Sequence, residues 1–537
     1  RSAAPGGLRV CRVLLLGLTL IPGSTQAQQA DSGTFRLYQG AAEVGWESYG
    51  REAGSFRQEV VVPSLNLRLR SHVTRTGAGG FLGMALSQSN GAGDSVRVEY
   101  SAEPVGDSVV VTLRRGENTV RHAVGGGFDG VLPPQSVAAF VDLVELTAGH
   151  DSTFRLLVAG PDSVMPAKVR WVGDTALVGF AGLEIRQTFD HGRVVEVIVP
   201  IQRVRAVRGP PSDSLASRAA AGRPVPDYRA PPAARYSALE ARVPVVSPTD
   251  SFSLGCTLTL PGSGRRPFPA AVTITGSGGQ TRDSELWPLL RGYRPFRQIA
   301  ERLAEAGIAV LRCDDRTTGS STGRLDSATT ADLAGDTRAQ LSWLRARPEI
   351  DRRRIGVIGH SEGGMIGPMI AVDDPTVAAV VIMAGPAKPG TEVLVDQARW
   401  PIETAPGLTD SVRQAKLAEV EAAVRADSTP GRPWMAWFRR YDPRETARRL
   451  KTPTLILQGA LDRQVTAGQA DTLAAAIRSA PNPDVTVRIF PGLNHLFLIT
   501  AGDGSPGEYS TLREVAVPAE VLDTLAGWLG ARLVARH

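Results

Sequence analysis

The chain has 537 residues, of which 42% are apolar and 21% charged, an ordinary globular composition in a chain too long for one hydrophobic core. We therefore expect two folded domains joined by connecting segments. The net charge is +6 and is carried mostly by Arg, but there is no dense basic block and no basic patch interleaved with aromatic residues, which argues against a nucleic-acid partner.

The first thirty residues have the pattern of an export signal. Arg9 and Arg12 precede a short apolar stretch, and small residues lead to an A-x-A-like cleavage site that ends at Ala27. The stretch is too short for a membrane anchor, and Cys11 precedes it, which is the wrong place for a lipidated Cys. We expect residues 1–27 to be a signal peptide, the protein to be secreted or periplasmic, and no stable membrane insertion.

Residues 31–205 contain many short strand-like segments separated by Gly-rich breaks. Apolar and polar residues alternate in 96–100, and 109–113 is rich in β-branched residues. One helix is expected, at about 134–144, and no repeat has the regularity of a propeller blade. The pattern predicts a mostly antiparallel, β-rich accessory domain. Residues 206–245 are rich in Pro, Ala and Arg, which predicts a semi-extended linker.

From residue 246 to 537 strand-like apolar runs alternate with amphipathic helices. Strands are expected at 271–275, 308–312, 355–359, 378–384, 454–458 and 485–490, and helices at 296–306, 331–346 and 467–480. This alternation predicts a mostly parallel sheet covered by helices on both faces. A long helical insertion at about 388–450 interrupts it, and we expect this insertion to form a lid.

A candidate nucleophile lies between a strand and a helix of this second domain. The buried-strand run 354–358 leads directly into Gly359-His360-Ser361-Glu362-Gly363, and a segment capable of forming a helix follows. In a G-x-S-x-G turn of this kind the Ser is held in a strained conformation with its hydroxyl exposed, and small neighbours avoid steric clashes. The alternative is a plain Gly-rich turn from strand to helix. The context favours Ser361 as a nucleophile.

A serine nucleophile needs a base and an acid that orients the base. In chains with a G-x-S-x-G turn of this kind, the acid follows the Ser in the sequence and the His follows the acid. Asp462 lies just past the strand at 454–458, and His495 follows the strand at 485–490. The other His after Asp462 is His537, the last residue and an expected frayed end. The rival acids Asp373 and Asp374 precede a strand rather than follow one. The predicted triad is Ser361, Asp462 and His495.

The tetrahedral intermediate of acyl transfer also needs donors for its oxyanion. The backbone N–H of Glu362, directly after the nucleophile, is one candidate. The strand at 271–275 leads into Gly276-Ser277-Gly278-Gly279-Gln280, and the backbone N–H of Ser277 is the second. The alternatives for this loop are a plain Gly-rich turn or a phosphate cradle, but it lacks the Lys of a phosphate loop and completes no G-x-G-x-x-G.

No cofactor or metal is expected. Besides Cys11, the chain contains Cys256 and Cys313, each in a strand-like run, and their spacing does not suggest a metal site. Pairing in an oxidising compartment and two buried free thiols both remain open.

Taken together, residues from about 245 onward resemble bacterial α/β-hydrolases of the esterase D class. The resemblance is carried by Thr-Gly-Ser-Gly-Gly-Gln-Thr-Arg-Asp at 275–283, by Gly-His-Ser-Glu-Gly-Gly at 359–364, and by the loops of Asp462 and His495. The elbow is also similar to that of prolyl-oligopeptidase-like enzymes. The resemblance covers somewhat over half of the chain. It implies the α/β-hydrolase fold and a serine-hydrolase triad, but it implies no particular substrate.

Two positions depart from the pattern of these relatives. Thr275 stands where they usually have His, and Thr317 replaces the Gly of Asp-x-Arg-Gly-x-Gly-x-Ser in 314–321. Four charged residues near these loops would either bind substrate or, as is more usual, tie the loops together through salt bridges: Arg282, Asp283, Asp315 and Arg316. Gln397, early in the insertion, is a candidate to hang over the pocket.

Three functions fit the sequence. The first is hydrolysis of a small-molecule carboxylic ester through an acyl-serine intermediate. The second is a secreted, aminopeptidase-like serine peptidase with the same triad, acting on short peptides. The third is a non-catalytic binding or scaffold protein whose β-rich domain carries the function, which the intact Ser–Asp–His order disfavours. The sequence leaves the acyl and alcohol specificity, the role of the β-rich domain and the oligomeric state open.

Overall fold

The computed structural model describes residues 31–40, 42–63, 67–76, 81–90, 96–115, 118–125, 128–133, 136–159, 162–180, 183–202, 204–220, 226–246, 251–286, 289–405, 408–426, 433–480 and 484–534. The expected signal peptide 1–27 and His537 lie outside these ranges. None of the helices in these ranges is long and apolar enough to cross a membrane.

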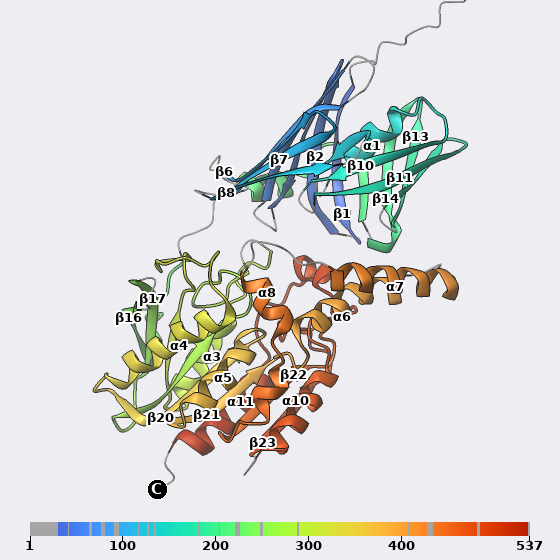
Figure 1. Cartoon of the computed structure of the whole chain (residues 1–537). Helices are drawn as coiled ribbons and strands as arrows, with labels where there is room; N and C mark the ends of the chain where they lie inside the picture. Colours follow the sequence, from blue (N-terminus) through green and yellow to red (C-terminus); the bar gives the residue numbers. More distant parts are fainter. Residues whose placement is uncertain are drawn as a thin grey trace, which may run out of the picture.

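The N-terminal part is one large, mostly antiparallel sheet (Figure 1). Within the described residues it has fifteen strands, in the order β8-β7-β6-β5-β4-β3-β2-β1-β15-β14-β13-β12-β11-β10-β9, and β9 with β10 is its parallel pair. The strands are β1 Asp31–Gln39, β2 Ala42–Glu52, β3 Ser55–Val62, β4 Leu67–Arg75, β5 Phe81–Asn90, β6 Val96–Val105, β7 Ser108–Arg115, β8 Asn118–Gly125, β9 Gly130–Leu132, β10 Ser152–Val158, β11 Ser163–Val172, β12 Thr175–Phe180, β13 Leu183–Asp190, β14 Arg193–Val199 and β15 Val204–Arg208.

Alternating burial explains why these segments pair as strands. In β4 the side chains of Leu67, Leu69 and Val73 are buried while those between them are more exposed, so that one face packs and the other meets water. The buried residues of both halves of the sheet form a single core together with helix α1. The expected β-rich domain is thus observed.

Helix α1 (Ala138–Glu145) is the helix expected at about 134–144, and a side chain from the sheet caps its N-terminus. Glu47 of β2 accepts hydrogen bonds from the backbone N–H groups of Val137 and Ala138, at 2.8 and 3.0 Å, and from the Ser136 hydroxyl at 2.7 Å. Its side chain is fully buried, and this burial raises the pKa of Glu47 to about 7 despite the three hydrogen bonds that lower it.

The segment expected to be a linker, 206–245, is partly regular. It holds the end of β15, the helix α2 (Asp213–Ala220) and most of strand β16 (Tyr236–Val246), which pairs with the second sheet. Strand β16 is an edge strand with many exposed side chains, so its composition resembles that of a linker. The second sheet therefore begins at Tyr236, before the expected boundary at 246.

The second sheet has eight strands in the described residues, in the order β16-β17-β19-β18-β20-β21-β22-β23. Its strands after β16 are β17 Ser251–Pro261, β18 Phe268–Ile274, β19 Ala309–Cys313, β20 Ile350–His360, β21 Val377–Met383, β22 Thr454–Gly459 and β23 Val485–Phe490. β17 is antiparallel to both of its neighbours, and the pairs from β19 to β23 are parallel. Each predicted strand run coincides with one of them.

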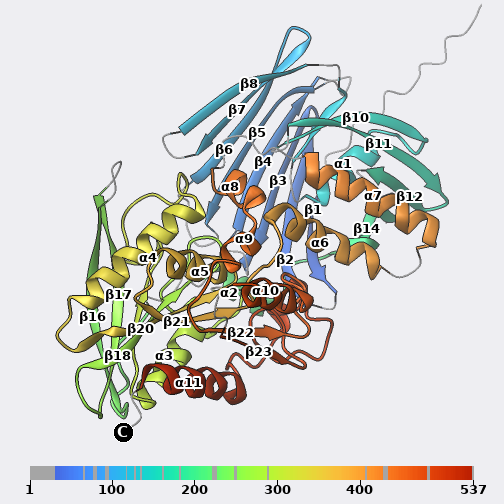
Figure 2. The same cartoon turned by 60° about the horizontal axis from the view of Figure 1, so that its bottom comes forward.

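Helices cover both faces of this sheet (Figure 2). On one face α3 (Pro295–Glu305) and α11 (Ala519–Leu533) share a core with the strands. On the other lie α4 (Thr330–Arg345), α5 (Gly363–Asp373), α9 (Pro443–Ala447) and α10 (Gly468–Arg478). Short 3-10 helices occupy Pro200–Gln202 and Pro506–Thr511. This is the α/β-hydrolase architecture that the alternating pattern predicts.

The expected helical insertion between β21 and β22 is observed. Before α9 it contains α6 (Gly390–Glu403), α7 (Asp410–Ala426) and α8 (Pro433–Arg440). α7 borders a cleft of about 1360 Å³ whose other wall is formed by strands β10 to β13 of the N-terminal sheet. The lid helices thus lie between the two sheets (Figure 1).

Candidate active site

Ser361 lies in a tight turn between β20 and α5. Its φ is 54°, in the left-handed region that non-Gly residues seldom adopt. A Cβ on Gly359 would collide with the backbone of Gly363, and one on Gly363 would collide with the carbonyl oxygen of Ile274. The two glycines are therefore a steric requirement of this turn, as expected for a nucleophile elbow.

Asp462 and His495 meet as the sequence predicts. The carboxylate Oδ2 of Asp462 lies 2.8 Å from Nδ1 of His495, and both side chains are buried. Asp462 Oδ1 accepts the backbone N–H groups of Gln464 and Val465, each at 2.8 Å, and Oδ2 also accepts the amide of Gln458 at 2.9 Å. A carboxylate held on both oxygens is a fixed acceptor for Nδ1–H, which leaves Nε2 of His495 free to take a proton.

The elbow and the His495 loop are in direct contact. His360, the residue before Ser361, places Nε2 2.9 Å from the carbonyl oxygen of His495, and the two imidazole rings lie 4.8 Å apart between centroids. Ser361, Asp462 and His495 thus follow the C-terminal ends of β20, β22 and β23, where the chemistry of an open α/β sheet gathers.

The Gly-rich loop after β18 lies against the nucleophile. A Cβ on Gly276 would be 3.2 Å from Cβ of Ser361, so the backbone at this position runs close to the Ser. Gly278 has φ 86°, a conformation that favours glycine. This placement is compatible with the backbone N–H groups of Ser277 and Glu362 as oxyanion donors, and their role stays a prediction.

Asp315 holds both ends of this loop. Oδ1 accepts the hydroxyl of Thr275 at 2.6 Å, and Oδ2 accepts the backbone N–H of Gln280 at 2.8 Å. Burial raises the pKa of Asp315 to about 7; these two hydrogen bonds oppose the shift, and the charges of Glu362 and Asp336 add to it. Thr275, which departs from the relatives' His, is therefore an anchor of the loop.

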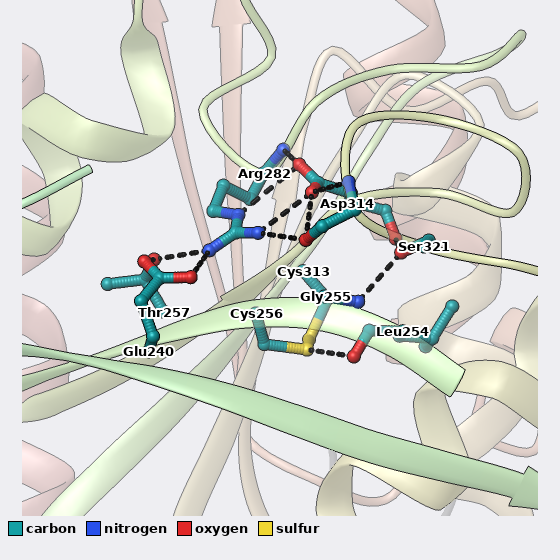
Figure 3. Close-up of a disulfide and its surroundings, with 10 residues drawn as sticks. Glu240, Leu254, Gly255, Cys256, Thr257, Arg282, Cys313, Asp314 and Ser321 are labelled. Carbon is teal, nitrogen blue, oxygen red and sulfur yellow. Dashed lines mark hydrogen bonds and ion pairs between the residues drawn. A yellow bond between two sulfur atoms is a disulfide. The ribbon is translucent and has the colours of Figure 1, made fainter. Parts of the chain in front are cut away.

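Arg282, another charged residue near these loops, forms salt bridges (Figure 3). Arg282 is 1% exposed and binds Asp314 at 2.8 Å, Glu240 at 2.8 Å and the Thr257 hydroxyl at 2.7 Å. Because Asp314 directly follows Cys313, this network adjoins a disulfide between Cys256 and Cys313, which face each other in register on β17 and β19. Of the two alternatives for these cysteines, a disulfide or two free thiols, the structure shows the disulfide.

Asp283 and Arg316 are likewise paired. Asp283 forms a buried ion pair with Arg312, and Arg316 binds Asp336 at 2.7 Å. Gln397 does not hang free over the site: its amide donates to the carbonyl oxygen of Gln464, at 3.0 Å, and so ties α6 to the loop of Asp462. Of the two roles that the sequence allows for these charged residues, the structure shows salt bridges that tie the loops together.

Sequence reasoning missed the side chain of Glu362. Its Oε1 accepts the hydroxyl of Thr330 at 2.6 Å and the indole N–H of Trp434 at 2.7 Å, while Oε2 is buried and has no hydrogen-bond partner among the described residues. Trp434 belongs to lid helix α8, and its ring stacks on Phe438. The residue after the nucleophile therefore connects the elbow with the lid. No sequence spacing signals this contact, because α8 lies in an insertion.

In the part of the chain that the structure describes, no cluster of three or more His, Cys, Asp or Glu side chains could hold a metal ion. The rival acids Asp373 and Asp374 bind Arg338 and Arg345 at the far end of α5 from Ser361.

The chain is similar in sequence to known hydrolases. Residues 250–496 match the model of the X-Pro dipeptidyl-peptidase (S15) family. The chain is 31% identical over 279 residues to esterase EstD of Thermotoga maritima, a match that covers 51% of this chain and 64% of EstD. It thus spans somewhat less than two thirds of the length of that relative.

Solved structures similar to part of the chain include two esterases. The Pyrococcus furiosus esterase Pf2001 matches 55% of this chain and 91% of its own, with 16% identity and a TM-score of 0.37. Est1E of Butyrivibrio proteoclasticus, solved with ferulic acid bound, matches 55% and 100%, with 16% identity and a TM-score of 0.38.

The strand order of the second sheet, the strained Ser361 elbow and the buried Asp462–His495 pair are all properties of one fold family. Together they give the C-terminal part of this chain the α/β-hydrolase fold, and the chain is similar in sequence to EstD.

Proposed function

We propose that the C-terminal domain hydrolyses carboxylic esters through an acyl-serine intermediate. The observation that carries this proposal is the Asp462–His495 hydrogen bond beside the Ser361 elbow, because it supplies an oriented base next to a partly exposed serine. The 31% identity to an esterase supports an ester over other acyl compounds.

The reaction proceeds in two halves. Ser361 Oγ attacks the ester carbonyl while His495 Nε2 takes its proton, and the Asp462 carboxylate stabilises the imidazolium that forms. The backbone N–H groups of Ser277 and Glu362 stabilise the oxyanion. His495 then gives the proton to the leaving alcohol. Water, activated by the same His, releases the acid and restores Ser361.

Replacement of the nucleophile tests the proposal. Ser361→Ala is expected to reduce turnover of p-nitrophenyl esters by about 10⁶-fold and to abolish labelling by a fluorophosphonate. Ser342→Ala, on the exposed side of α4, is the matched control and is expected to leave both unchanged. Full ester turnover by Ser361→Ala would overturn the assignment. A wild-type chain that is not labelled would favour a non-catalytic binding protein.

A peptidase is the second candidate, and the S15 match over residues 250–496 favours it. The same triad would cleave an amide bond after a short N-terminal segment of a peptide. A panel of p-nitrophenyl esters and X-Pro p-nitroanilides of matched size separates the two. A higher kcat/KM on the anilides would assign the peptidase, and a higher kcat/KM on the esters the esterase.

We also propose that the chain is exported, with cleavage after Ala27. The charged and apolar pattern of residues 1–27 supports export, and so does the Cys256–Cys313 disulfide, because such bonds persist in oxidising compartments. Expressed with this segment, the protein is expected in the periplasm of a Gram-negative host with Gln28 as its first residue. Equal periplasmic yield without the segment would contradict the proposal.

A further inference from the structure

His360 is placed to act on the catalytic base rather than on the substrate. It ends β20, directly before Ser361, and its Nε2 lies 2.9 Å from the main-chain carbonyl oxygen of His495. That carbonyl belongs to the same residue as the imidazole that takes the Ser proton. A hydrogen bond that fixes the main-chain carbonyl of His495 therefore also restrains the imidazole ring of the same residue.

Other hydrogen bonds also fix the loop around His495, and those named next, all among described residues, do not join it to the elbow. Asn494 Oδ1 accepts the backbone N–H groups of Leu496 and Leu498 at 3.0 and 3.1 Å. The Tyr293 hydroxyl donates to the carbonyl oxygen of Leu496 at 2.8 Å. These bonds shape the loop by itself, whereas the bond from His360 sets its position relative to Ser361.

The charge of His360 suits this role. Burial lowers the pKa of His360 to about 4, and repulsion from the neighbouring His495 imidazole, when that ring is protonated, lowers it further, while the bond to the His495 carbonyl and the charge of Asp462 oppose the shift. Its ring faces His495 and the ring of Phe497. A neutral His360 with a proton on Nε2 donates to the carbonyl and adds no positive charge beside the imidazolium that forms on His495.

We propose that His360 is a positioning residue for catalysis, which holds His495 against Ser361 by donating Nε2–H to the His495 carbonyl oxygen. This rests on the proposed function of Ser361 and His495. A displacement of about 1 Å between reacting groups is enough to lower a rate by about 10²-fold. The hydrogen bond from His360 therefore acts on kcat rather than on the binding of the ester.

Two substitutions separate the donor from the ring. His360→Phe keeps a ring of similar size but has no donor, and it is expected to lower kcat on p-nitrophenyl acetate about 10- to 100-fold with KM within about threefold. His360→Gln places an amide N–H near the position of Nε2 and is expected to restore kcat to within about threefold of the wild type. The rate of labelling by a small fluorophosphonate is expected to follow kcat in both variants.

A double-substitution cycle tests whether His360 acts through the base. In the His495→Ala background, His360→Phe is expected to change the slow labelling of Ser361 less than twofold, since the residue to be positioned has lost its imidazole. An equal fall in both backgrounds would overturn the proposal, and so would a wild-type kcat in His360→Phe. Failure of His360→Gln to recover kcat, with both variants melting at the wild-type temperature, would also overturn the proposal, because it contradicts the donor role.

The failure of this inference is distinguishable from that of the proposed function. If Ser361→Ala keeps its ester turnover, the triad itself is wrong. If Ser361→Ala is inactive but His360→Phe turns over at the wild-type rate, the triad stands and only the role of His360 falls.

Discussion

The indole N–H of Trp434 donates to the carboxylate of Glu362 over 2.7 Å, and so joins lid helix α8 to the residue that follows the nucleophile. Because the backbone N–H of Glu362 is also a predicted oxyanion donor, one residue serves the lid through its side chain and the reaction centre through its main chain.

Trp434→Phe is expected to lower kcat about 3- to 10-fold, because it keeps the ring stacked on Phe438 but leaves a buried carboxylate with one donor fewer. Trp437→Phe on the same helix, where the ring stacks on Tyr441, is the matched control. Steady-state ester kinetics of both variants provide the measurement. Equal effects of the two changes would show that the hydrogen bond to Glu362 has no specific role.

Asp462→Asn is expected to lower kcat by about 10⁴-fold without unfolding the domain. The Asn oxygen can replace Oδ1 as acceptor for the N–H groups of Gln464 and Val465, but its NH₂ then faces Nδ1 of His495 and forces the wrong tautomer. The exposed Asp471→Asn on α10 serves as control. A fall of less than about tenfold would mean that another group orients His495.

Glu47 is expected to make the N-terminal domain less stable as the pH rises. Burial raises its pKa from 4.5 to about 7, so the folded state binds the proton more tightly than the unfolded chain. The free energy of unfolding that this proton contributes is fully present below pH 4.5 and is lost as the pH rises through 7, with an upper size of about 3 kcal/mol.

Glu47→Gln imitates the protonated side chain, since its oxygen can accept the N–H groups of Val137 and Ala138 while its NH₂ donates to Ser136. The variant is expected to melt like the wild type at pH 5 and at a higher temperature at pH 8. Calorimetry of the full chain at both pH values is the measurement. A wild-type protein whose N-terminal transition does not change between these pH values would contradict the shift.

Removal of the disulfide is expected to destabilise the C-terminal domain and to leave its chemistry intact. The bond closes a loop with a sequence separation of 57 residues, and chain entropy puts its contribution at about 4 kcal/mol. The double change Cys256→Ala with Cys313→Ala is expected to lower the melting temperature by roughly 5–10 °C. Ester turnover at 25 °C is expected within about threefold of the wild type, because the triad follows β20, β22 and β23.

A reductant provides the control for this change. It is expected to lower the melting temperature of the wild type toward that of the double variant and to leave the variant unaffected. An unchanged melting temperature in the double variant would contradict the expected contribution of the bond.

The elements of the C-terminal domain were predictable because local patterns determine them. The apolar runs before Ser361 and Asp462 became buried parallel strands, and the run before His495 became the partly exposed edge strand β23. Chain order then placed the three side chains at one end of the sheet. The sequence pattern identifies these strands because the buried strands of a parallel sheet are nearly continuous apolar runs.

Features that depend on register or on distant contacts were not predictable in this way. The pairing of Cys256 with Cys313 requires that β17 and β19, which are not consecutive in the chain, lie side by side in one register. The bond from Trp434 to Glu362 depends on how an insertion folds back. Strand β16 has the composition of a linker, because an edge strand exposes many of its side chains to water.

The docking of β16 and of the residues before it also decides where this chain can be divided. Arg297 donates to the carbonyl oxygens of Asp227 and Arg229, at 2.7 and 3.0 Å, so these residues belong physically to the hydrolase half. A fragment that begins at 246 would lose the partner strand of β17, and Arg282 would lose Glu240. Its unpaired edge would invite association with other chains, whereas a fragment that begins before Asp227 keeps that edge covered.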